Sequence, residues 1–414
     1  MTVCRRLLLA AAFCLAPAAS RAVSVPLPVE GSTLNLTVFI QTQALLNENG
    51  SPDGQSPSYD VFVRRSRLQV NGDIGKSFSY YFQVDNTNFG KFGNFTGRLI
   101  VQDAWVGWAP TGNTGPTVVY LEGGIVYLPV SRGVLTSSAS QPTAEGHPDL
   151  YRGFSSSFYS ANRTTGVQVR GWALGKRLGF RGGVYEGVQP TAADPGLNPH
   201  RVPAVGGFVN FNILGSEEGS FLYQSIYFAK DPILSISLSG SYQSRAIRVP
   251  KGVTDQREIA STLFLDYPLS EQQELVFMLA GYGYGNGTGS RDTGIGVAVD
   301  LGFRYRFVRP YLSYEYFDSS DCPTDGSATP VQCAAVHTAD SRNFRAGLDF
   351  YVNKTQNHVI LEFSLNRGQS SWGAQSITAA AAGYVPAVAS GSPPLASLTR
   401  SASKSLLLHW SVYF

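Results

Sequence analysis

Apolar side chains recur at every second position along most of this chain, from near Ser32 to the last residue. At the start of this pattern, Leu34, Leu36 and Val38 alternate with neighbours that are mostly polar. Successive side chains of a β-strand point to opposite faces, so a period of two indicates strands with one apolar and one polar face. The pattern therefore predicts an all-β chain.

Turn residues divide the alternation into about 16 segments of roughly ten residues, the strand length of an outer-membrane barrel. The predicted strands lie near residues 33–45, 61–71, 78–87, 98–109, 117–127, 164–173, 178–187, 203–214, 233–243, 259–269, 275–285, 294–306, 309–318, 342–353, 358–367 and 404–414. Short connections such as 174–177 alternate with long polar ones such as 128–163, 244–258 and 368–403. This alternation is typical of a transmembrane antiparallel up-and-down β-barrel. The connection 214–233 breaks it, and we predict an ordered periplasmic excursion there.

The last predicted strand, 404–414, ends on an aromatic residue, Phe414. Its alternate residues Leu406, Leu408 and Trp410 are expected to face lipid. In a closed barrel the last strand pairs with the first, so no open edge remains. A C-terminal aromatic on such a strand also resembles the signal that the bacterial barrel-assembly machinery reads. The alternative interpretation is the edge strand of a secreted β-sandwich.

Composition agrees with a barrel. Only 15% of the residues are charged, against roughly 25% in ordinary soluble domains. The mean hydropathy of −0.05 argues against a bundle of transmembrane helices. Residues 1–22 have the charged start, short apolar run and small-residue site of a secretory signal peptide, with cleavage expected after Ala22 or Ala18. The barrel domain is therefore expected to span residues 23–414.

Loss of residues 1–22 would change both the charge and the cysteine count. The remaining chain has a formal net charge of zero, with 22 arginines and seven lysines, and lacks the basic footprint of a nucleic-acid binder. Cys322 and Cys333 remain in one polar stretch, and a disulfide between them is predicted for an oxidising compartment. The sequence has no Cys/His metal-ligand spacing, so no metal or other cofactor is expected.

The sequence gives no support for an enzyme. It lacks the nucleophile-elbow, zinc-protease and P-loop motifs. The five histidines are spread over predicted loops and strands: His147, His200, His337, His358 and His409. We therefore do not expect catalysis.

Several segments resemble the phosphate-selective porin O/P family. They are VFVRRSRLQVNG (61–72) followed by FSYYFQVD, VQDAWVGW (101–108), GGIVYLPVSRGVLTSS (123–138), RTTGVQVRG (163–171) and RGGVYEG (181–187). The resemblance covers about residues 60–190. Beyond them it is mostly a similar alternation of strands and connections. It implies a 16-stranded, trimeric outer-membrane channel whose third external loop folds into the pore and narrows it. That loop would be 128–163 here.

Arginine side chains are the candidates for lining the pore. A guanidinium binds oxyanions through its planar fork and is always charged. Leu68 and Val70 are expected to face lipid. Alternation along the predicted strand 61–71 then points Arg65 and Arg67 into the lumen and Arg64 outward. The full set of candidate pore-lining residues is Arg65, Arg67, Arg132, Arg152, Arg163, Arg170 and Arg181.

The sequence predicts a bacterial outer-membrane channel for passive diffusion of small hydrophilic solutes and ions, with a weak preference for anions. Its expected partners are two further copies of the chain, outer-membrane lipid and lipopolysaccharide. A phosphate- or polyphosphate-selective channel is the first alternative, although Ile125 and Tyr127 stand where the family often carries Gln and Lys. The second alternative is a non-conducting structural or adhesive barrel that uses 368–403 as its contact surface.

Overall fold

The computed structural model describes residues 23–48, 50, 56–97, 99–147, 150, 163–190, 195–217, 221–249, 252–287, 293–319, 340–368 and 403–414. The predicted signal peptide, Arg152, the cysteine pair Cys322 and Cys333, and nearly all of connection 368–403 lie outside these residues.

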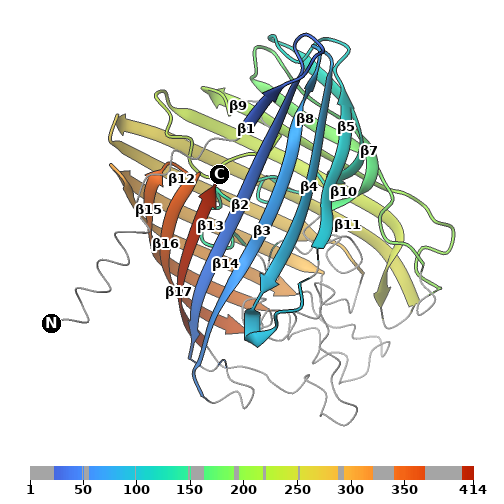
Figure 1. The fold of residues 1–414 in the computed structure, drawn as a ribbon. Helices are drawn as coiled ribbons and strands as arrows, with labels where there is room; N and C mark the ends of the chain where they lie inside the picture. Colours follow the sequence, from blue (N-terminus) through green and yellow to red (C-terminus); the bar gives the residue numbers. More distant parts are fainter. Residues whose placement is uncertain are drawn as a thin grey trace.

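Sixteen strands, β2 to β17, form a closed antiparallel barrel (Figure 1). Each strand pairs with the next along the chain, and β17 pairs with β2 to close the barrel. A 3₁₀ helix, η1 (Lys91–Gly93), lies between β4 and β5. The strands are β1 (Val23–Pro26), β2 (Thr33–Asn47), β3 (Ser58–Ile74), β4 (Phe78–Phe89), β5 (Leu99–Trp108), β6 (Val118–Tyr127), β7 (Arg163–Ala173), β8 (Leu178–Tyr185), β9 (Ala204–Leu214), β10 (Ile233–Val249), β11 (Gly252–Ser270), β12 (Gln273–Tyr284), β13 (Gly294–Tyr305), β14 (Val308–Ser319), β15 (Ser341–Asn353), β16 (Asn357–Gly368) and β17 (Ser403–Tyr413). The predicted closed barrel is confirmed.

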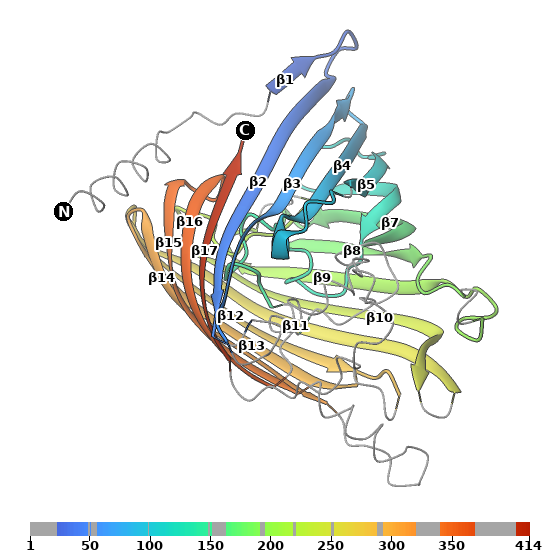
Figure 2. The ribbon, with the colours of Figure 1, turned by 60° about the horizontal axis from the view of Figure 1, so that its bottom comes forward.

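The short strand β1 was not expected from the sequence. It pairs with the start of β2, with Val23 opposite Leu36. Farther along the same edge of β2, the backbone of Phe414 exchanges two hydrogen bonds with Val38, of 2.8 and 3.2 Å. β1 therefore continues the line of β17 along β2, and Figure 2 shows it beyond the C-terminus at one rim.

Adjacent residues of a strand differ sharply in exposure, as the period of two predicts. In β7, Val167 is 63% exposed whereas the next residue, Gln168, is 3% exposed. In β10, Leu238 is 55% exposed and Ser239 is 5% exposed. The barrel is thus apolar outside and polar inside, the arrangement that suits a barrel surrounded by lipid. Among the described residues, no helix has the length and apolar character needed to cross a membrane.

The predicted long loop 244–258 is wrong in extent, because most of it continues two strands. β10 runs to Val249 and β11 starts at Gly252, with these two residues opposite each other. A register shift between Gln243 and Ile247 accommodates the extension. Such a bulge leaves residues unpaired but lets the ladder resume beyond it, so the polar and turn-forming residues here do not end the strands.

The connection between β9 and β10 is ordered, but it is not a periplasmic excursion. Its described residues, 215–217 and 221–232, fold into the barrel. Ile226 is fully buried in a cluster with inward-facing residues of β11 and β12, among them Phe264 and Met278. The apolar side chains of this connection explain why it folds inward, since burial in the barrel removes them from water.

Gly124 in β6 is required by close packing against β5. Its φ is +132°, and a Cβ atom there would overlap the Ala104 carbonyl oxygen and approach the Trp105 Cα to 2.8 Å. Gly124→Ala should therefore destabilise the barrel by about 1–3 kcal/mol. The measurement is the thermal midpoint in detergent, with Gly75→Ala as the control because Gly75 has a φ of +61° but nothing within 4 Å. Equal losses in the two variants would contradict the steric argument.

Candidate functional site

Two segments from opposite rims meet inside the barrel. The loop segment (residues 128–147) follows β6, and the turn segment (residues 215–217 and 221–232) follows β9. Thr136 forms a β-bridge with Tyr223. The Tyr223 N–H donates to the Leu135 carbonyl at 2.8 Å, and the Ser225 N–H donates to the Ser140 carbonyl at 3.0 Å. These backbone contacts join the two segments across the lumen.

A buried ion pair between Arg132 and Glu217 strengthens this junction. The Arg132 guanidinium also donates to the Gln224 carbonyl at 2.8 Å and lies 3.8 Å from the centre of the Phe264 ring. The Glu217 carboxylate accepts a hydrogen bond of 2.9 Å from the Tyr227 hydroxyl. Both charged side chains are almost completely buried, so removing one would leave the other without compensation at a cost of about 3–5 kcal/mol.

The loop segment crosses the interior to the opposite wall. The Ala144 N–H donates to Glu362 of β16 at 3.1 Å, and Arg309 of β14 donates to the Pro142 carbonyl at 3.2 Å. His147 contacts Asp300 of β13 through Nε2 at 3.1 Å. Contacts with β2 and β3 at the near side complete the span, so this segment is held by strands on several sides of the barrel.

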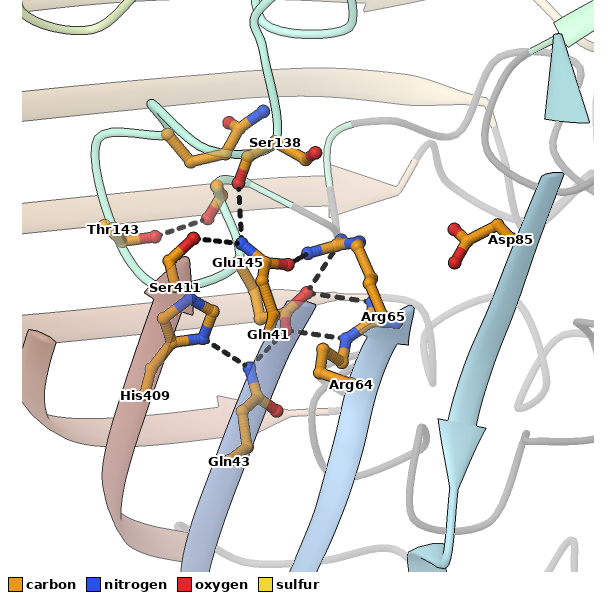
Figure 3. A network of polar contacts seen from close by, with 12 residues as sticks. Gln41, Gln43, Arg64, Arg65, Asp85, Ser138, Thr143, Glu145, His409 and Ser411 are labelled. Carbon is orange, nitrogen blue, oxygen red and sulfur yellow. Dashed lines mark hydrogen bonds and ion pairs between the residues drawn. The ribbon is translucent and has the colours of Figure 1, made fainter. Parts of the chain in front are cut away.

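Glu145 anchors the loop segment to β2 and β3 (Figure 3). Arg64 binds its carboxylate with both Nε and Nη2, at 2.7 and 2.9 Å. Arg65 adds a longer contact of 3.4 Å and donates to Gln41 at 2.6 Å. Gln43 donates to the same carboxylate at 2.5 Å. Two guanidiniums therefore share one carboxylate, which leaves a local excess of positive charge.

The predicted outward position of Arg64 is wrong. Gln41 lies opposite Arg65, but the next residue of β2, Thr42, lies opposite Val63. The extra residue in β3 is a bulge, which changes the parity of the strand locally. Arg64 and Arg65 consequently both reach the inner carboxylate.

Most of the remaining candidate arginines lie inside and are paired with carboxylates. Arg67 donates to Asp85 at 2.8 Å, and Arg163 donates to Asp103 at 2.7 Å. The other pairs are Arg170 with Glu122, at 2.8 Å, and Arg132 with Glu217. Arg181 differs from them. In the described part of the chain no carboxylate forms an ion pair with it, and its Nη2 donates to the Phe221 carbonyl at 2.6 Å.

The partner carboxylates are the functional residues that sequence reasoning missed. For Glu122 a signal existed, because Glu122 and Arg170 share the inward parity of two adjacent strands and pair with inward neighbours. For Glu217 no such signal existed, since its position depends on how the turn segment folds. The inner surface thus carries closely balanced charges, and any selectivity must come from local excesses such as those at Glu145 and Arg181.

The charge state of Glu145 is set by its neighbours. Burial would raise the pKa of Glu145, but the Arg64 and Arg65 guanidiniums outweigh it and hold the pKa well below its ordinary value. The ionised carboxylate therefore stabilises the fold above the unfolded pKa of about 4.3, and this contribution is lost only as the pH falls through the lower folded value. The anchor should persist at mildly acidic pH.

His147 should make the loop segment sensitive to alkaline pH. Burial disfavours its protonation, but the Asp300 carboxylate outweighs this and raises the pKa of His147. The stabilisation is complete below the unfolded pKa of about 6.5 and is lost as the pH rises through the folded value. Wild type should lose more stability than His147→Gln between about pH 6 and about pH 9, as measured by the urea midpoint in detergent. Equal losses would show that His147 does not carry this effect.

Comparisons with known proteins agree with this architecture. The model of the family described as phosphate-selective porin O and P matches residues 45–201. An anion-selective porin from Comamonas acidovorans is 13% identical over 92% of this chain and 100% of that chain, with a TM-score of 0.53. OmpF of Salmonella typhi, solved in complex with daunomycin, is 11% identical over 95% and 100%, with a TM-score of 0.55. OmpT of Vibrio cholerae in its trimer form is 11% identical over 93% and 100%, with a TM-score of 0.51. No curated protein sequence is significantly similar to the chain.

The family match over residues 45–201 confirms the resemblance predicted from the sequence for about residues 60–190. The structural likeness confirms the predicted barrel fold.

Proposed function

We propose that this chain, a bacterial outer-membrane porin whose residues 45–201 match the phosphate-selective porin O and P family, conducts small hydrophilic solutes with a weak preference for anions. Passive diffusion needs a wall that presents polar groups to water and an outer surface that lipid accepts. Solutes would pass when the loop segment and the turn segment move apart. The loop segment is the proposed constriction.

The observation that carries the anion preference is the arrangement at Glu145, where Arg64 and Arg65 face one carboxylate. The uncompensated guanidinium would attract an anion at the level where the loop segment contacts the wall. The candidates Arg67, Arg163 and Arg170 contribute less, because a carboxylate neutralises each of them. A weak preference follows from this balance of charges rather than a strong one.

Phosphate selectivity is a second candidate function, because the matched family is described as phosphate-selective. A guanidinium pair can bind a phosphate through several oxygen atoms at once. We also propose a homotrimer, supported by the similar barrel of OmpT in its trimer form. These two proposals are independent, since the pore lies within one barrel.

Solute flux into liposomes tests the proposed function. Vesicles containing the folded protein should swell in isotonic glycine or small sugars. They should swell faster in sodium acetate than in the salt of an amine cation that is as large as acetate. Slowing of acetate uptake by low phosphate concentrations would favour phosphate selectivity. Vesicles that remain impermeable although they contain folded protein would refute diffusion and favour a structural barrel.

A further inference from the structure

The ring of Phe221, in the turn segment, occupies an aromatic slot in the barrel wall. We define this Phe221 slot by Tyr81 of β4, Trp105 of β5 and Tyr127 of β6. The Phe221 ring centroid lies 4.9 Å from that of Trp105, 5.7 Å from that of Tyr81 and 5.6 Å from that of Tyr127. The Tyr127 ring meets Phe221 edge-on at 69°. Separations and angles of this kind favour aromatic partners, so the slot is shaped for a planar ring.

Two guanidiniums complete the slot beside the ring. Arg181 and Arg170 lie 5.2 and 5.5 Å from the Phe221 ring centroid, within the range of cation–π attraction. Arg181 also donates from Nη2 to the carbonyl oxygen of Phe221 at 2.6 Å. Phe221 thus presents an aromatic ring to the slot and an oxygen acceptor to Arg181, both from one residue.

Two buried donors at the slot have no acceptor within the part of the chain that the structure describes. They are Nη1 of Arg181 and Nε1 of Trp105, on side chains that are 5% and 7% exposed. A buried donor without an acceptor is costly, so these groups call for an acceptor that Phe221 does not supply. A small cavity adjoins Arg181 and is also lined by Arg170 and Tyr223, among others.

Charge distinguishes Arg181 from its neighbour. Arg170 is neutralised by Glu122, whose carboxylate accepts a hydrogen bond of 2.8 Å from the Arg170 Nε. Arg181 forms no ion pair with any carboxylate in the described residues and binds only a neutral carbonyl there. A carboxylate in place of that carbonyl would make a charge-assisted, bidentate contact with Arg181, which is roughly twice as strong as a neutral hydrogen bond.

We propose that the Phe221 slot is a solute-binding site for aromatic carboxylates, and that Phe221 occupies it as an internal competitor. The solute's ring would lie between Trp105 and Tyr127, and its carboxylate would bind Arg181. The proposal rests on the proposed function, in that solutes must enter the barrel to reach the slot. The turn segment has to withdraw Phe221 before the solute binds, which lowers the apparent affinity by the fraction of time for which the slot is free.

Isothermal titration calorimetry of the folded protein in detergent tests this directly, with phenylacetate as the probe. Acetate lacks the ring, and cyclohexylacetate has the same charge without aromaticity. Phe221→Leu should bind phenylacetate about tenfold more tightly than wild type, because the competing ring is gone. Phe228→Leu is the matched control, since Phe228 lies in the same segment but packs against Tyr351, and it should bind as wild type does. Arg181→Gln in the Phe221→Leu background should remove the gain.

Equal affinities for phenylacetate and cyclohexylacetate, or no tightening in Phe221→Leu protein shown to be folded by its heat-dependent mobility on gels, would overturn the proposal. Calorimetry needs no ion flow, so it remains informative if the barrel does not conduct. Conversely, a barrel that conducts but fails to bind phenylacetate would refute only the slot and leave the channel standing.

Discussion

A disulfide between the two inner segments should nearly abolish conduction. Ser140 and Ser225 are both buried, and the Ser225 N–H contacts the Ser140 carbonyl at 3.0 Å and its hydroxyl at 3.1 Å. Cysteine is close to serine in size, so Ser140→Cys with Ser225→Cys places two thiols at this junction without adding bulk. Oxidised protein should carry less than about a tenth of the current of the reduced protein, because the segments can then no longer part.

Planar-bilayer recording before and after reduction is the measurement, with mass spectrometry to establish that the bridge has formed. Wild type and the variant with Ser140→Cys alone, treated in the same way, control for Cys322 and Cys333. If bridged and reduced proteins conduct equally, solutes pass beside the joined segments and these do not need to separate.

Removal of the guanidinium pair at Glu145 should abolish the anion preference. Arg64→Gln with Arg65→Gln keeps hydrogen-bond donors for the carboxylate but removes two positive charges beside it. Burial alone raises the pKa of Glu145 and only those guanidiniums keep it ionised, so the site would lose its local positive excess. The permeability ratio of chloride to potassium should fall about threefold or more. Charges at a constriction act on permeating ions more strongly than distant charges do.

The opposite substitution and a matched control sharpen this expectation. Glu145→Gln should raise the preference for chloride, because it leaves both guanidiniums uncompensated. Arg342→Gln removes an exposed arginine that lies 5.4 Å from the Tyr316 ring on the barrel wall, and it should leave the ratio unchanged. Identical ratios in all these variants would mean that the ion path avoids Glu145.

Strand positions could be predicted from the sequence because burial imposes a period of two on every strand. β2, for example, was expected at 33–45 and spans Thr33–Asn47. The alternation predicted the wrong face for Arg64, because a bulge inserts one residue into β3 without any change in the hydrophobic pattern. The extension of β10 and β11 into the predicted loop 244–258 was missed because polar residues beyond the membrane can extend a ladder as well as end it.

The interior was less predictable than the wall. Charged residues of the loop segment were recognised, but their partners come from distant parts of the chain, such as Glu217 for Arg132. The inward fold of the turn segment depends on long-range packing of Ile226 and Phe221. A local pattern cannot specify such contacts, although apolar residues in a supposedly exposed turn were a usable signal.

We propose that this barrel is a diffusion channel with a weak anion preference. The reversal potential of the purified, folded protein across a KCl gradient in a planar bilayer tests it most directly. We expect discrete channels whose reversal potential is displaced modestly toward the chloride equilibrium potential. A displacement toward the potassium equilibrium potential, or no channels from protein shown to be folded and inserted, would contradict it.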